Sequence, residues 1–89
     1  MTINDFEKHI APAILKRGRD YFNNGHVGEL DENDNFWTAE VYGSDDYLVE
    51  IRLNEQGEIY KYTCDCPYDG IVCKHVAAVC FAIRERSLI

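Results

Sequence analysis

The chain has 89 residues, of which 46% are hydrophobic and 12% aromatic, and its formal net charge at pH 7 is −7. This length suits one domain with a modest core, and the apolar content is too high for a disordered segment. The negative net charge argues against a domain that binds nucleic acid with its whole surface. No apolar segment follows Met1 and no apolar run could span a bilayer, so we expect a cytoplasmic protein without a membrane partner.

The charges are distributed unevenly along the chain. Residues 29–58 carry ten acidic side chains and one basic side chain, whereas residues 1–28 and 59–89 each carry three acidic and four basic side chains. An anionic partner would therefore have to contact the two ends of the chain. The candidate contacts for a nucleic acid are Lys16, Arg17, Arg19, Lys74, Arg84 and Arg86. Taken singly, each of these residues is also typical of a solvated helical face.

The N-terminal part of the chain predicts two helices. Its apolar residues recur at helical spacing, Thr2 and Asn4 can each cap a helix start, and Asn4 with Glu7 resembles a capping box. Pro12 interrupts the pattern because proline withholds a backbone donor and clashes with the preceding turn. We therefore expect a short helix over about residues 4–10 and a second helix over residues 12–23. The sequence Asn23-Asn24-Gly25 is a typical end signal for the second helix.

The middle of the chain predicts an antiparallel sheet, because its apolar residues alternate with a period of two. Polar turns rich in Asn, Asp and Gly separate the alternating segments, which is typical of a meander of three or four strands. We expect Trp37 and the tyrosines to be packing residues rather than a binding platform. The expected strands are residues 27–30 (weak), 36–42, 47–53 and 58–63, with a polar turn over 31–35.

The C-terminal segment returns to helical spacing and predicts a helix over residues 74–87. Cys80 lies on its apolar stripe, five residues after His75. We interpret Cys80 as a buried core thiol, and the alternative is that it replaces His75 as a metal ligand. His9 and His26 have no cysteines nearby, so we interpret both as ordinary polar residues.

Three cysteines and one histidine lie within twelve residues, in the order Cys64-Asp-Cys66-Pro-Tyr-Asp-Gly-Ile-Val-Cys73-Lys-His75. Side chains two residues apart on a strand point to the same face, so Cys64 and Cys66 can approach one ion. Residues 68–72 are long enough to bring the chain back to Cys73. Cys73 then begins the last helix, where free backbone donors favour a thiolate, and His75 lies in its first turn. We therefore predict that Cys64, Cys66, Cys73 and His75 bind one Zn²⁺ in a closed tetrahedral site.

A closed zinc site is poorly suited to catalysis. Four protein ligands leave no position for an activated water, so we expect neither enzymatic activity nor a small-molecule substrate. Three thiolates outweigh the charge of one zinc ion, and Lys74 can offset the excess. Disulfides are the alternative use of the cysteines, but a Cys-x-Cys pair on a strand is poorly placed to close and no secretion signal is evident.

The pattern Cys64-x-Cys66-x6-Cys73-x-His75, followed by an apolar helix, resembles the SWIM zinc finger. Residues 17–27, upstream of the sheet, resemble the leader of this finger in bacterial Swi/Snf-type helicase proteins. The resemblance implies a small sheet followed by a helix around one zinc ion, in a non-catalytic module for protein–protein contact or DNA binding. We thus expect an α+β chain that is a single domain over 1–89, with a helical leader (1–25), an antiparallel sheet (27–63) and the finger (64–87).

The leading functional hypothesis is a zinc-binding interaction module of a larger nucleic-acid-associated protein. We favour contact with another protein or domain over direct contact with DNA, because residues 29–58 are strongly acidic. A helicase engine in the same chain is a candidate partner, although no Gly-x-x-x-x-Gly-Lys-Ser/Thr phosphate loop occurs in these 89 residues. The alternative is a purely structural, zinc-stabilised cap of a larger enzyme, with no ligand of its own.

Overall fold

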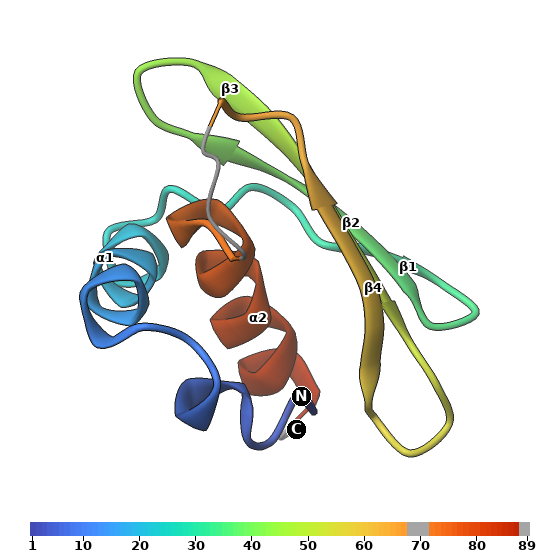
Figure 1. Cartoon of the computed structure of the whole chain (residues 1–89). Helices are drawn as coiled ribbons and strands as arrows, with labels where there is room; N and C mark the ends of the chain where they lie inside the picture. Colours follow the sequence, from blue (N-terminus) through green and yellow to red (C-terminus); the bar gives the residue numbers. More distant parts are fainter. Residues whose placement is uncertain (68–71, 88–89) are drawn as a thin grey trace.

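The computed structural model describes residues 1–67 and 72–87, and it is an α+β fold as the sequence predicts (Figure 1). A short 3₁₀ turn and one helix precede a four-stranded antiparallel sheet, and a second helix follows it. In chain order the elements are η1 (Phe6–Lys8), α1 (Pro12–Asn23), β1 (Asp31–Asn33), β2 (Phe36–Tyr42), β3 (Asp46–Leu53), β4 (Ile59–Cys64) and α2 (Lys74–Ser87).

The four strands pair in sequence order, β1-β2-β3-β4, so each strand lies beside its neighbour in the chain. Direct cross-strand pairs include Glu40 with Leu48. Alternation along β2 and β3 turns the small and β-branched side chains towards the helices, where they are buried. The residues buried in this way include Ala39, Val41, Val49 and Ile51.

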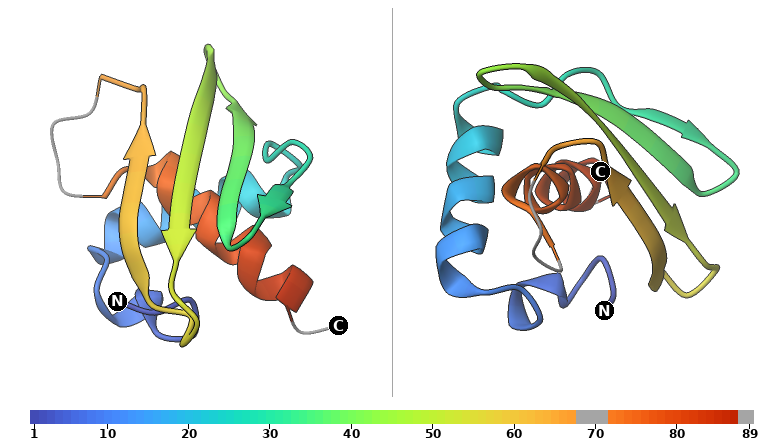
Figure 2. Two further views of the ribbon diagram at one scale, coloured as in Figure 1. Left: turned by 90° about the vertical axis from the view of Figure 1, so that its right-hand side faces the viewer. Right: turned by 45° about the horizontal axis from the view of Figure 1, so that its top comes forward.

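Helix α2 is the centre of the molecule. It lies between α1 on one side and the sheet on the other (Figure 2, right). Every residue from His75 to Ile83 is buried, so the helix is covered all round over this stretch and not along one stripe only. No helix within residues 1–67 and 72–87 is long and apolar enough to cross a membrane.

Helices α1 and α2 approach closely at a glycine that the sequence reasoning missed. Gly18 is buried, and a Cβ atom placed on it would lie 2.5 Å from the Cβ of Ala77 and 3.0 Å from the carbonyl oxygen of Lys74. Real side chains do not tolerate such contacts, so the position accepts only glycine at this helix separation. The contact fixes the start of α2 against the middle of α1.

The predicted helix over residues 4–10 is wrong, because only Phe6–Lys8 forms a 3₁₀ turn. The backbone N–H of Thr2 donates to the Asp5 carboxylate at 2.6 Å, and the N–H of Asp5 donates to the Thr2 hydroxyl at 3.1 Å. These reciprocal bonds make the local cap at Thr2, one of the two expected capping residues, with Asp5, and not with the expected pair Asn4 and Glu7. The N–H of Ile3 also donates to a sheet-turn carbonyl at 2.9 Å, which pins this segment to the sheet.

The predicted weak strand over residues 27–30 is also wrong. In this segment Val27 forms only an isolated bridge with Val41, whereas β1 occupies Asp31–Asn33, which the sequence predicted as a turn. The reason is a tighter turn than expected: Asp34 and Asn35 both have positive φ, 55° and 65°. Such a two-residue turn matches the twist of the strands and starts the pairing immediately on either side.

Candidate metal centre

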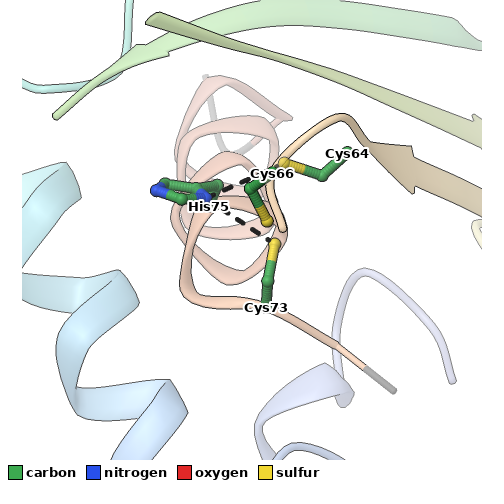
Figure 3. Close-up of side chains that lie close together, drawn as sticks. All are labelled: Cys64, Cys66, Cys73 and His75. Atoms are coloured by element: carbon green, nitrogen blue, oxygen red, sulfur yellow. Dashed lines mark hydrogen bonds between the residues drawn. The ribbon is translucent and has the colours of Figure 1, made fainter. Parts of the chain in front are cut away.

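The end of β4 and the start of α2 bring the four predicted ligands together (Figure 3). Cys64 is the last residue of β4, and Cys66 follows two residues later. Cys73 directly precedes α2, and His75 lies in its first turn. Residues 68–71, which the sequence predicts to return the chain to Cys73, lie outside the described residues.

The geometry of this group fits one tetrahedral ion. One ligand atom from each of Cys64, Cys66, Cys73 and His75 lies within 4.8 Å of all the others. Nδ1 of His75 is 3.8 Å from the Sγ atoms of both Cys64 and Cys73. Zinc bonds of about 2.3 Å to sulfur and about 2.0–2.1 Å to nitrogen put tetrahedral ligand atoms about 3.6 Å apart. The donor set and its spacing therefore suit Zn²⁺, with Nδ1 as the imidazole donor.

The thiols differ in acidity. The pKa of Cys73 is lowered to about 5, first because the Cys64 thiol donates to it, and also because the backbone N–H of Val76 donates to its Sγ at 3.4 Å. The pKa of Cys64 is raised, because it shares its proton with Cys73 and because it is partly buried. Cys73 at the helix start is thus the natural first thiolate, and metal binding must displace the proton of Cys64.

Two tyrosine rings hold the His75 imidazole in place. The Tyr47 ring of β3 lies 4.5 Å from it, centroid to centroid, at an interplanar angle of 31°. The Tyr21 ring of α1 lies 5.6 Å away at 68°, and the Lys74 ammonium lies 5.1 Å from the Tyr21 centroid. Packing from two elements restricts rotation of the ring and keeps Nδ1 directed at the thiols. The sequence reasoning missed both tyrosines.

A carboxylate between the first two ligands ties the metal loop to the sheet. Asp65 stands between Cys64 and Cys66, and its Oδ1 accepts the backbone N–H of Leu48 at 2.9 Å. The backbone of β3 therefore holds the segment that carries Cys64 and Cys66 in place. This bond is a second link between the metal centre and the sheet, beside the β3–β4 pairing itself.

Cys80 lies outside the four-residue group. It is fully buried in the hydrophobic core, and burial raises the pKa of its thiol to about 12. This confirms the prediction that Cys80 is a core thiol. The two remaining histidines make ordinary polar contacts: His9 lies 3.7 Å from the Asp5 carboxylate, and Nδ1 of His26 lies 2.6 Å from the Tyr42 carbonyl oxygen.

The six basic residues predicted as candidate nucleic-acid contacts lie in different surroundings. Arg17 and Lys74 line an open hollow of about 280 Å³ beside Cys66, Cys73 and His75. This pair is therefore the one that lies at the metal centre. Lys16 is exposed on α1.

The other three basic residues are engaged within the fold. Arg19 lies 3.0 Å from the Glu7 carboxylate, and Arg84 pairs with the same carboxylate. Hydrogen bonding to Arg84, and then to Arg19, lowers the pKa of Glu7. Arg86 donates to the carbonyl oxygen of Leu30 at 3.0 Å. The contact set as a whole stays a prediction.

Comparison with known proteins agrees with the geometry. Residues 47–84 match the sequence model of the SWIM zinc finger family. The chain is also 33% identical over 78 residues, or 88% of its length, to an uncharacterized protein of Methanocaldococcus jannaschii. The aligned region spans about a third, 32%, of that relative. No solved structure gives a significant match.

Proposed function

We propose that the whole 89-residue chain acts as one non-catalytic, intracellular module that contacts a partner protein or another domain of a larger nucleic-acid-associated protein. The proposal starts from the SWIM-type zinc finger of residues 47–84, which binds Zn²⁺ and is a binding module. The observation that carries the proposal is the closed donor set: ligand atoms of Cys64, Cys66, Cys73 and His75 lie within 4.8 Å of one another and would fill all four positions of a tetrahedral ion. Such an ion has no position for water or substrate, so its role is to hold the surface of the module in shape and not to catalyse a reaction.

Protein contact is favoured over DNA contact by the state of the basic residues. Arg19 and Arg84 already share the Glu7 carboxylate, which reduces the positive charge they can offer to phosphates. The surrounding chain has a net charge of −7, which repels a polyanion at long range. Arg17 and Lys74, beside the metal centre, are the residues that would carry a DNA contact.

Two experiments test the proposal. The zinc-loaded chain and its Cys66→Ala variant are compared in native affinity purification, and we expect a protein that the variant fails to retain. A fluorescent DNA duplex is then titrated at about 50 and about 200 mM salt, where phosphate contacts would weaken steeply with salt. We expect no salt-dependent binding, and a strong salt dependence would replace the protein version with the DNA version.

The structural-cap hypothesis predicts a different pattern. Chelation should unfold the chain under both hypotheses, because zinc binds only the folded state. If zinc serves only to hold the fold against a larger enzyme, no separate protein distinguishes the wild type from the Cys66→Ala variant. That absence of a partner would overturn the interaction module.

A further inference from the structure

The sheet has one uncovered face. Figure 2 (left) shows the four strands in front and both helices behind them. Because side chains alternate across a strand, the burial of Val41 towards α2 sends Glu40 and Tyr42 to the opposite face. No helix or strand within residues 1–67 and 72–87 covers that face, so its side chains meet solvent or a partner.

Two large side chains with apolar area are exposed on this face. Leu48 is 45% exposed and Tyr42 is 43% exposed. The register pairs Glu40 directly with Leu48 and Tyr42 directly with Asp46, which makes Leu48 and Tyr42 diagonal neighbours on adjacent strands. Diagonal neighbours are about 7–8 Å apart, within reach of long side chains. The two residues thus share one face of adjacent strands and together make an apolar spot, in which the end of the Tyr42 ring lies beside Gly28, on the side of β2 away from β3.

Carboxylates surround the apolar spot. Glu40 and Asp46 are the cross-strand partners of its two members, and Asp65 accepts the backbone N–H of Leu48. We call these five residues the outer patch: Glu40, Tyr42, Asp46, Leu48 and Asp65. All of them are exposed.

The carboxylates of the outer patch have no cation of their own. Within the described part of the chain, the ion pairs closer than 4.0 Å are formed by Asp5 and Glu7, and none involves Glu40, Asp46 or Asp65. On the same strands, Arg52 lies at the far end of the face, where its guanidinium stacks over Phe36, 3.9 Å from the ring centroid. The patch therefore combines exposed apolar area with unneutralised negative charge.

We propose that the outer patch binds a lysine- or arginine-rich segment of a partner protein. Basic side chains of that segment contact Glu40, Asp46 and Asp65, and an apolar side chain packs on Tyr42 and Leu48. Charge complementarity at the rim with apolar contact at the centre is the usual arrangement of a protein interface. This inference rests on the proposed interaction module and assigns its surface and the chemistry of its partner.

The zinc site is built into this surface. Asp65 lies between the ligands Cys64 and Cys66, and its carboxylate is held by the Leu48 N–H. Zinc therefore fixes one carboxylate of the patch at its place beside Leu48. The metal would thus contribute to binding the partner by positioning Asp65, although the ion itself has no open coordination position for a ligand.

The test uses ¹⁵N-labelled, zinc-loaded chain titrated with the peptide acetyl-Lys-Leu-Lys-Leu-Lys-Leu-amide. We expect amide shifts concentrated at residues 40–42 and 46–48, with affinity that falls as salt rises. Glu40→Lys/Asp46→Lys should weaken binding at least about tenfold, because it places like charges at the contact. Leu48→Thr, which keeps a strand-forming residue, should weaken it by about threefold or more through loss of apolar contact.

The matched control is Asp20→Lys/Glu55→Lys, which changes the net charge equally at two exposed positions on α1 and in the β3–β4 turn. We expect the control to bind within about twofold of the wild type, since exposed charges far from a contact are screened. Equal weakening by both double variants, or shifts outside the patch, would show unspecific attraction and overturn the patch assignment. If a partner is still lost by Cys66→Ala in that case, the proposed function stands and only its surface is wrong; if no partner is lost, both fail.

Discussion

At the scale of single residues, Cys66 offers the cleanest test of the ligand set, because it is half-exposed and its truncation leaves little cavity. Cys66→Ala should lose stoichiometric zinc and with it the cooperative thermal transition. Zinc binding that occurs only in the folded state adds about 10–16 kcal/mol of apparent binding free energy, which a chain of this size cannot replace. Native mass spectrometry counts the zinc, and circular dichroism follows the melting.

Cys80→Ala is the matched control, since it removes a thiol that is fully buried but lies outside the metal group. This variant should keep one zinc ion per chain and lose about 1–2 kcal/mol of unfolding free energy through the small cavity. Loss of zinc from Cys80→Ala, or its retention by Cys66→Ala, would show that the ligand set is wrong.

The sequence could identify the four ligands but not their surroundings. Cys64 and Cys66 are marked by strand alternation, and Cys73 by its place before a helix, because these are local rules. The rings of Tyr47 and Tyr21 reach the imidazole from β3 and from α1, which are distant in the chain. Their contact depends on tertiary packing, for which spacing in the sequence gives no signal.

At the scale of elements, the crossing of α1 and α2 depends on Gly18. Gly18→Ala should destabilise the fold by about 1–3 kcal/mol, because the added methyl would overlap Ala77 and the backbone of α2 and force the helices apart. Asp20→Ala, at an exposed position inside the same helix, controls for the helix preference of alanine and should be neutral or slightly stabilising. Urea denaturation of the zinc-loaded proteins measures both, and an unchanged midpoint for Gly18→Ala would contradict the close approach.

The elements that the sequence predicted well are those with strong local signals. Helix α1 begins at Pro12 and ends at Asn23, as Pro12 and the following Asn-Gly indicate. The N-terminal segment has helical periodicity too, but Ile3 hydrogen-bonds to the sheet turn and Phe6 packs on the Phe81 ring at 5.0 Å. Tertiary contacts thus outweighed the helical preference of this segment, and the periodicity of its sequence carries no information about those contacts.

At the scale of the whole molecule, the acidic middle of the sequence becomes a surface only through the register of the sheet. A shift of one residue between β2 and β3 would send Leu48 and its neighbours to the core side. The register instead places Leu48 opposite Glu40, on the face away from α2. The sequence gives the excess charge, whereas the grouping of carboxylates around two exposed apolar residues depends on the folded sheet.

The whole fold should also respond to acid through the zinc site. The pKa of Cys73 is lowered from its ordinary value of 9.0 to about 5, so its contribution to stability is complete above pH 9 and is lost as the pH falls through about 5. Zinc binding acts in the same direction, because all three thiols must be deprotonated. We therefore expect the chain to retain zinc at about pH 7 and to release it, with loss of helix, as the pH approaches about 5.

A zinc indicator dye and far-UV circular dichroism, followed through the same pH titration, measure this release. The two signals should change together, because Cys73 and His75 join the metal to α2, the helix around which α1 and the sheet pack. Cys80→Ala should keep the same midpoint, since its thiol is neutral throughout this range. Release that is complete above about pH 6 would contradict this expectation. Helix that persists after zinc release would mean that the metal holds only the loop and not the fold.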